Sequence, residues 1–273
     1  MSSTERLGAT PAALLSTDCL SPESLRPGQA LARAFCYFRV SAIEVIAMTA
    51  TFPASTVRDH PLQTWHSATW EDYLALRDDP SNERIRLAFN EGWLWILMGA
   101  EGMNHASVSD LFTAFLFVWA MRHPDQGFSS FGRCLLEQPG TRASAPDLVL
   151  YIGPDYPQWQ PGESRRIDLT QHPIPALVGE IADTTLATDL DEKKHLYAAL
   201  GIPEYWVIDV QGRRVFAFAR QGNGTYQSCD TSQALADLPI AWLTEALERL
   251  ANGSNTHVAT WFGQQIATLA PPQ

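Results

Sequence analysis

The stretch PALVGEIADTTLATDLDEKKHLYAALGIPEYWVID, residues 175–209, contains the pattern that decides the fold. Its first part, ALVGEIA, is an apolar run of strand length that contains one carboxylate, Glu180. A helix is predicted at about residues 190–200, because Gly201 and Pro203 are typical of a helix end. EYWVIDV then predicts another strand. Two strands joined by a helical crossover indicate an α/β or α+β protein.

The segments before this stretch predict further strands and helices. Thr69 with Asp72 three residues later predicts the start of a short helix. RIRLAF and WLWILM around a Gly-containing loop at residues 90–92 predict a β-hairpin. Helical spacing of apolar residues predicts a mostly buried helix from about 104 to 121. FGRCLLEQ and DLVLYIG predict two more strands, the second of which begins at Asp147.

The two ends of the chain differ from this core. Residues 1–60 are rich in Ser, Thr, Ala and Pro without periodic apolar residues, which predicts a poorly ordered N-terminal extension. RRVFAFAR predicts a hairpin strand joined at Gln211-Gly212, and GTYQSC an edge strand. Helices broken at Asn252-Gly253 are expected near the end. The expected organisation is therefore a core at 61–230 followed by a C-terminal helical appendage at 231–273.

Composition narrows the class of protein. Of the 273 residues, 45% are hydrophobic, enough for a sizeable core. The net charge of -11 argues against avid nucleic-acid binding, although a bound cation can offset carboxylates at a site. No two of the four cysteines form a CxxC pair, which favours free thiols in a reducing cytoplasm. The apolar run AFCYFRVSAIEVIAM is short and contains charges, so no membrane span is expected.

Two carboxylates stand at strand ends in apolar surroundings. Asp147 follows Pro146, and Glu180 lies inside an otherwise apolar strand. Such carboxylates are costly to bury unless a cation or hydrogen bonds satisfy them, and two together can hold one Mg²⁺ ion. The backbone carbonyl of Ile181 is a further candidate ligand. Alternatively, Glu180 lies at an exposed edge or pairs with an Arg, and Asp147 only caps the start of its strand.

The two lysines are the next candidates, because the 19 Lys and Arg residues include only Lys193 and Lys194. Lys193 shares a helix face with Tyr197, whereas Lys194 points elsewhere and is expected in solvent. A lysine near two carboxylates and a cation can hold the attacking water and stabilise charge at phosphorus. The alternative is an ordinary surface lysine.

Two other polar residues are assigned structural roles from the sequence. Asp189 and Glu192 have capping-box spacing, which favours a helix cap over a metal ligand at Asp189. His105, at the start of the helix predicted at about 104–121, could approach the site. A structural histidine is the preferred interpretation there.

The series formed by Pro146-Asp147, Glu180 to Ala182, Asp189-x3-Lys193-x3-Tyr197 and GIPEYWVID resembles the Uma-two family of restriction endonucleases, in the PD-(D/E)XK superfamily. The resemblance runs from about Thr69 to Arg220. It implies a restriction-endonuclease-like mixed central sheet flanked by helices, Mg²⁺ or Mn²⁺ as cofactor, and DNA as substrate. A strict E-x-K motif would place lysine at position 182, where this chain has Ala182. In the family the lysine is displaced to the following helix, which Lys193 fits.

The sequence-based hypothesis is thus a metal-dependent endonuclease. Asp147, Glu180 and Lys193 form its catalytic set, and Asp147 and Glu180 hold the metal. Cleavage of both DNA strands would suggest a homodimer. Two alternatives stay open: a catalytically weak relative that binds nucleic acid or protein, and an unrelated hydrolase with paired carboxylates, such as a glycosidase.

Overall fold

The computed structural model describes residues 60–82, 85–99, 101–236 and 238–269, so almost all of the predicted N-terminal extension (1–60) lies outside the described residues. The helices are α2 (Trp70–Asp78), α3 (Met103–Ala120), α4 (Leu186–Leu190), α5 (Glu192–Ala199), α6 (Ile240–Leu250) and α7 (Asn255–Ile266), with a 3-10 turn η3 at Pro80–Asn82. The strands are β1 (His66–Ser67), β2 (Ile85–Asn90), β3 (Trp93–Met98), β4 (Phe128–Ser130), β5 (Leu136–Gln138), β6 (Arg142–Ser144), β7 (Leu148–Ile152), β8 (Ile167–Asp168), β9 (Leu177–Ala182), β10 (Glu204–Asp209), β11 (Arg214–Arg220) and β12 (Tyr226–Ser228).

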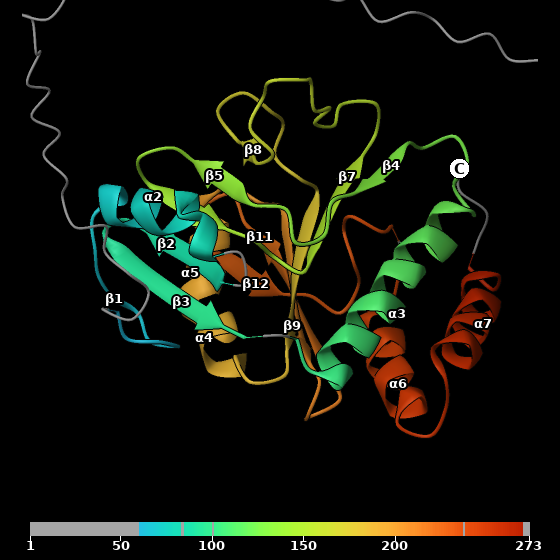
Figure 1. The fold of residues 1–273 in the computed structure, drawn as a ribbon. Coiled ribbons are helices and arrows are strands. Elements are labelled where there is room, and N and C mark those ends of the chain that lie inside the picture. The colour runs from blue at the N-terminus through green and yellow to red at the C-terminus, as the bar shows by residue number, and fades with distance from the viewer. Residues whose placement is uncertain (1–59, 83–84, 100, 237, 270–273) are drawn as a thin grey trace, which may run out of the picture. The chain divides into compact units, whose positions relative to one another are not determined.

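These strands form two mixed sheets, and the second of them is the predicted mixed sheet with helices on both faces. The first sheet has the order β1-β3-β2-β6-β5-β8, and the second has the order β12-β11-β10-β9-β7-β4 (Figure 1). The division arises because the β2–β3 hairpin continues through β6, where Phe89 pairs with Ala143, and makes no pairing with β7 or β9. The predicted mixed α/β class is confirmed.

The predicted crossover of residues 175–209 organises the second sheet. β9 and β10 are parallel neighbours, with Glu180 opposite Val207, and α4 and α5 connect them. Hairpin pairing then joins β10 to β11 and β11 to β12. GTYQSC therefore contributes the predicted edge strand.

Alternation of side chains along the second sheet creates two cores. One face packs against α3, α6 and α7, which lie together on one side of this sheet in Figure 1. The opposite face packs against α5 and the first sheet, with Leu196, Tyr197 and Trp95 among its neighbours. A third core joins α2 to the far face of the first sheet. The space between the two sheets is thus filled by the core that contains α5.

Several local predictions are confirmed in detail. Thr69 caps α2 in a capping box with Asp72. The β2–β3 turn places Glu91 at φ 45° and Gly92 at φ 90°, the pair of positive values that a tight two-residue hairpin requires.

The two C-terminal helices separate near Asn252-Gly253 as predicted. Leu243 of α6 and Phe262 of α7 belong to the same core as α3 and the second sheet. Among the described residues, no helix is long and apolar enough to cross a membrane.

The strand predicted for FGRCLLEQ is only partly correct. β5 begins at Leu136, whereas residues 131–134 form a turn in which the Cys134 amide donates to the Phe131 carbonyl. Arg133, at φ 67°, donates its amide to the Pro146 carbonyl instead of to a neighbouring strand. The turn therefore runs directly along the backbone that leads to Asp147.

Gly132 is the tightest point of this turn, because a Cβ there would lie 2.6 Å from the carbonyl oxygen of Asp147. Gly132→Ala should cost about 1–3 kcal/mol through overpacking, which lowers the melting temperature by about 2–10 °C. Gly222→Ala is the control, since a Cβ at Gly222 meets nothing within 4 Å. Thermal unfolding of both variants tests this, and an equally small effect in both would contradict the close approach.

Candidate functional site

The pleat of the second sheet turns Asp147 and Glu180 to the same face. In β7, Val149 and Tyr151 face the core that contains α5, and Asp147 has the same parity along the chain. In β9, Val178 and Ala182 face that core, and Glu180 lies between them.

The register of the two strands brings these carboxylates next to each other. β7 and β9 are antiparallel, and their pairing ends at Leu148 opposite Gly179. One step further along this register, Asp147 stands opposite Glu180. Side chains of residues directly opposite each other in an antiparallel pair lie on one face and are close neighbours.

Asp147 is 2% exposed, and its carboxylate oxygens have polar partners on several sides. Arg86 of β2 donates to its Oδ1, His105 Nε2 lies 3.2 Å from its Oδ2, and the Ile181 amide donates to the same Oδ2 at 2.8 Å. Burial alone would raise the pKa of Asp147, but the His105 contact, the Arg86 charge and the Ile181 amide hold that pKa well below its ordinary value. Asp147 is therefore a stable anion.

Glu180 is in a different environment, although it is equally buried. Tyr197 of α5 donates to its Oε1, and Lys193 Nζ lies 3.2 Å from the same oxygen. Burial raises the pKa of Glu180 to about 7, with further increases from the nearby Asp189 and Asp147 charges, while the Lys193 charge opposes the shift. Two neighbouring carboxylates thus have pKa values displaced in opposite directions.

Lys193 is 5% exposed and is held between two carboxylates. Its Nζ lies 3.2 Å from Glu180 Oε1 and 3.0 Å from Asp189 Oδ1, and 4.7 Å from the centre of the Trp95 ring. Burial would lower the pKa of Lys193, but the charges of Glu180 and Asp189 raise it above its ordinary value. The predicted shared face of Lys193 and Tyr197 is confirmed, since both contact Glu180. Lys194 lies away from this group, over the Phe218 ring.

The predicted cap at Asp189 is wrong. Asp189 lies inside α4, is fully buried, accepts from the Thr185 hydroxyl at 2.6 Å and pairs with Lys193. The helix divides one residue later, and Glu192 accepts from Thr188 rather than taking part in a capping box. The spacing of four residues between Asp189 and Lys193 is itself a signal for an ion pair on one helix face.

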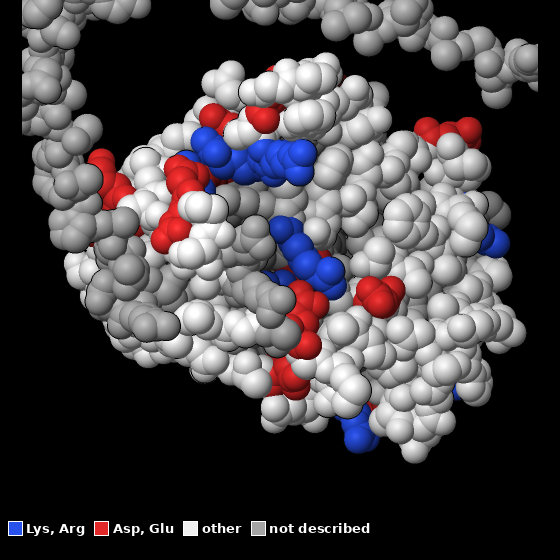
Figure 2. Space-filling model, viewed as in Figure 1, with Lys and Arg blue, Asp and Glu red and all other residues white. Residues whose placement is uncertain are grey.

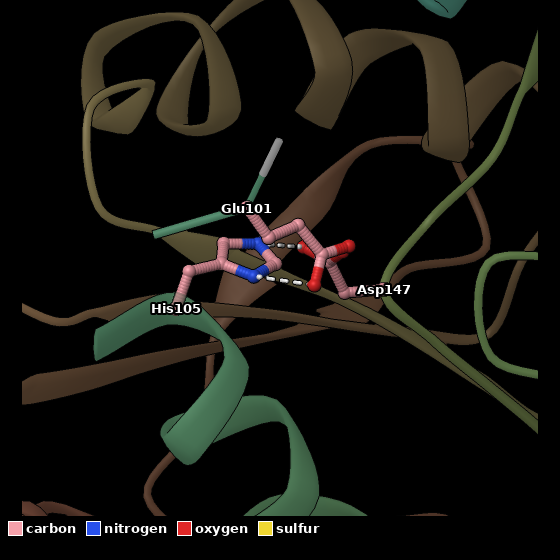
Figure 3. Close-up of side chains that lie close together, drawn as sticks. All are labelled: Glu101, His105 and Asp147. Carbon is pink, nitrogen blue, oxygen red and sulfur yellow. Dashed lines mark hydrogen bonds and ion pairs between the residues drawn. The ribbon is translucent and has the colours of Figure 1, made fainter. Parts of the chain in front are cut away.

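His105 belongs to the site and is not a remote structural histidine. Figure 3 shows its imidazole between Glu101 and Asp147, with one ring nitrogen directed to each. Nδ1 lies 3.4 Å from Glu101 Oε2, and this buried nitrogen has no hydrogen-bond partner among the described residues. One ligand atom from each of Glu101, His105 and Asp147 lies within 4.8 Å of the others, so the three could hold a metal ion.

All three sequence-predicted site residues line one small cavity of about 40 Å³ between the sheets. The first sheet contributes Arg86, Trp95 and Leu97 to its wall, and the segment after β9 contributes Asp183, Thr184 and Thr185. The site residues in its lining are His105, Asp147, Glu180, Ile181 and Lys193. This volume has room for an ion or a water molecule, since a cavity of about 10–15 Å³ already holds one water.

Arg86 and Glu101 were not found from the sequence. Arg86 alternates with apolar residues in β2, which indicates only a strand with one polar face. Glu101 sits in a short connection before α3 and pairs with Arg86 and Arg133. No sequence spacing links either residue to Asp147. Both come close to Asp147 only because segments distant in sequence pack against each other.

The family model Uma2, described as "Putative restriction endonuclease", matches residues 70–251, which is more than half of the chain. The chain therefore belongs to the Uma2 family. This confirms the resemblance noted in the sequence. No curated protein matches the chain.

A crystal structure described as a putative nuclease belonging to DUF820 from Anabaena variabilis ATCC 29413 is similar at 18% identity. The similarity covers 71% of this chain and 99% of that chain, with a TM-score of 0.45. Such a distant likeness adds nothing to the assignment of the site.

The raised pKa of Glu180 predicts a pH-dependent difference in stability between the parent and Glu180→Gln. A carboxyl whose folded-state pKa of about 7 exceeds its ordinary value of about 4.3 stabilises the fold below about pH 4. That contribution is lost as the pH rises through 7. The Gln side chain does not titrate, so the variant should gain up to about 3 kcal/mol relative to the parent between pH 4.5 and pH 8.

Urea unfolding at both pH values, without divalent cations, measures this difference. Glu248→Gln is the control, because the Glu248 side chain is 57% exposed. A free-energy difference for Glu180→Gln that is the same at both pH values would show that the Glu180 pKa is not raised.

Proposed function

We propose that this protein is a metal-dependent endonuclease that hydrolyses DNA phosphodiester bonds, with Asp147, Glu180 and Lys193 as its catalytic residues. One observation carries the proposal: two buried carboxylates with opposite pKa shifts share a cavity with a buried lysine. Perturbed pKa values in a cavity are typical of functional sites. Membership of the Uma2 family supports the nuclease class.

The donor set suits a hard divalent cation. Asp147 and Glu180 would hold it, as Mg²⁺ and Mn²⁺ are usually bound through carboxylate oxygens. Glu101 and His105 offer ligand atoms within 4.8 Å of each other and of one from Asp147, so they are further candidate ligands, and an imidazole ligand favours Mn²⁺ over Mg²⁺. When bound, such a cation polarises a phosphoryl oxygen and lowers the pKa of water.

Lys193 acts as a hydrogen-bond donor and a positive charge, because its raised pKa keeps the ammonium protonated at neutral pH. In that form it cannot accept a proton from water. It can donate hydrogen bonds to the attacking water and to a phosphate oxygen, where negative charge develops during hydrolysis. Asp189 and Glu180 hold Nζ from two sides and therefore fix where this charge is placed.

Arg86 and a divalent cation compete for Asp147, because the guanidinium already contacts Asp147 Oδ1. Arg86→Gln removes a positive charge beside the carboxylates, so it should tighten Mn²⁺ binding by about ten-fold, or about 1.4 kcal/mol. Isothermal titration calorimetry measures this. Arg213→Gln is the control, since Arg213 pairs with Glu248 at the surface. Unchanged affinity in Arg86→Gln would place the cation away from Asp147 Oδ1.

Cleavage of plasmid DNA tests the proposed activity directly. The purified protein should cut DNA only with Mg²⁺ or Mn²⁺. Glu180→Gln should abolish cutting, because it removes a charge that holds the cation. Lys193→Ala should lower the rate by about 100-fold or more while it keeps Mn²⁺ binding, since Lys193 acts on water and phosphate.

Lys194→Ala is the matched control, with the neighbouring lysine changed on the same helix, and it should cut at the parent rate. Equal losses in Lys193→Ala and Lys194→Ala would contradict the assignment of Lys193. Metal binding without any cleavage by the parent protein would instead favour a catalytically silent relative that binds its partner on the same fold.

The remaining parts of the proposal follow from the reaction. Cutting both strands of a duplex would require two copies of a single-site enzyme, so we propose a homodimer on DNA. A reducing, cytoplasmic location agrees with the free thiols of Cys134 and Cys229.

A further inference from the structure

A second cavity of about 290 Å³ lies on the surface beside the candidate site. Its wall is mostly apolar, with Phe131, Trp159 and Ile167 in it, and two guanidinium groups, Arg165 and Arg166, border it. Its volume is at the lower limit of small-molecule pockets, which start at about 300 Å³. The proposed mechanism uses none of these residues.

Trp159 is held in place with its ring open to solvent. The side chain is 53% exposed, although a large aromatic residue is normally buried. Its Nε1 donates to the Glu163 carbonyl at 3.0 Å, and Glu163 Oε2 in turn accepts from the Gln160 amide at 2.8 Å. The hydrogen-bonding edge of the indole is thus already satisfied, and the exposed part of its ring is what remains for a ligand.

The lining of this pocket carries two guanidinium groups and one carboxylate, Glu163, although the whole chain is acidic. Arg165 is exposed, lies 5.8 Å from the centre of the Trp159 ring and forms no ion pair with any other described residue. Arg166 Nε lies 2.6 Å from Glu137 Oε2, and its side chain stays 35% exposed. Figure 2 shows Lys and Arg side chains gathered near the centre and upper centre of one face of the molecule.

The turn at residues 131–134 connects the pocket to the candidate site. Phe131 and Cys134 line the pocket, whereas Arg133 Nε pairs with Glu101 Oε1 at 3.1 Å. Gly132, between them, lies against the Asp147 backbone. The pocket and the candidate site therefore share this short turn, with Arg133 between its two pocket residues in sequence.

We propose that this pocket binds an unpaired nucleobase of the DNA strand that the candidate site cleaves. The base stacks on Trp159, and Arg165 and Arg133 contact the phosphates on either side of it. The proposal rests on the proposed function and narrows its substrate to DNA, single-stranded or duplex, in which the strand to be cut carries an unpaired base. Aromatic rings beside arginines are the common means of binding single strands, because every base has a stacking face.

Stacking in this pocket discriminates against intact duplex DNA. Bases in a duplex are already stacked on both faces, and moving one of them outward costs unpairing energy. A single strand, a flap or a frayed end has no such cost. We therefore expect the parent protein to bind single-stranded DNA more tightly than a blunt duplex of the same length.

Fluorescence anisotropy with a labelled oligodeoxythymidylate, in EDTA so that no cleavage occurs, tests the pocket. Trp159→Ala should weaken binding by about ten-fold, and Trp159→Phe should retain most of it. Trp93→Ala is the matched control, because Trp93 is also 53% exposed but lies on β3, outside the pocket. Arg165→Ala should weaken binding and lower its salt dependence, whereas exposed Arg122→Ala should not.

Melting temperatures of both tryptophan variants show whether each is folded. Parent-like binding by folded Trp159→Ala, or equal affinity for an oligonucleotide with abasic sites, would overturn the pocket assignment. So would equal binding of blunt duplex, or a preference for RNA over DNA. Because the assay contains no divalent cation, a protein that fails here and still cuts DNA keeps the proposed function. One that binds through Trp159 and never cuts DNA keeps the pocket and loses the nuclease activity.

Discussion

The ammonium of Lys193 is buried between the two sheets, and a charge in that position has to be met by opposite charge within about 3 Å. Glu180 of β9 and Asp189 of α4 provide it, at 3.2 and 3.0 Å. This requirement holds α4 and α5 against the second sheet, with Tyr197 packed beside Glu180. The crossover, the helix phase and the carboxylate positions all depend on the same ion cluster.

A buried cluster of this kind is a poor way to stabilise a protein. The desolvation of each ion costs several kcal/mol, and well-packed apolar residues of similar volume are often as stable or more so. Removing one partner is much worse, because it leaves an unpaired charge in the core. The cluster therefore adds little to folding stability, which agrees with the catalytic role proposed for Asp147, Glu180 and Lys193.

The site exists only where the two sheets meet. The second sheet provides Asp147 and Glu180 as neighbours across an antiparallel pair. The first sheet contributes Arg86 and Trp95, and His105 comes from the first turn of α3. Arg86 and His105 balance the Asp147 charge and hold the carboxylate in one orientation. The same turn that passes behind Asp147 also forms a wall of the Trp159 pocket, so the candidate site and the proposed base pocket share one backbone segment.

Local sequence patterns determined much of this protein. Period-two and helical spacings predicted the β2–β3 hairpin, α3, the β9–α5–β10 crossover and the C-terminal helices. An acid inside an apolar strand marked Glu180, and the scarcity of lysine marked Lys193. These signals are readable because they depend on neighbours within a few residues of each other.

Which of these strands and helices contact each other was set only by the tertiary structure. It divided the strands into two sheets, and it turned residues 131–134 away from the predicted strand toward the Asp147 backbone. It also brought Arg86, Glu101 and His105 to Asp147 from 42 to 61 residues away in sequence. Alternation along a strand shows that one face is polar, but the partner of that face is set by packing between distant segments. For Asp189 the sequence allowed both a helix cap and an ion pair with Lys193 four residues later, and burial of the ammonium decided for the ion pair.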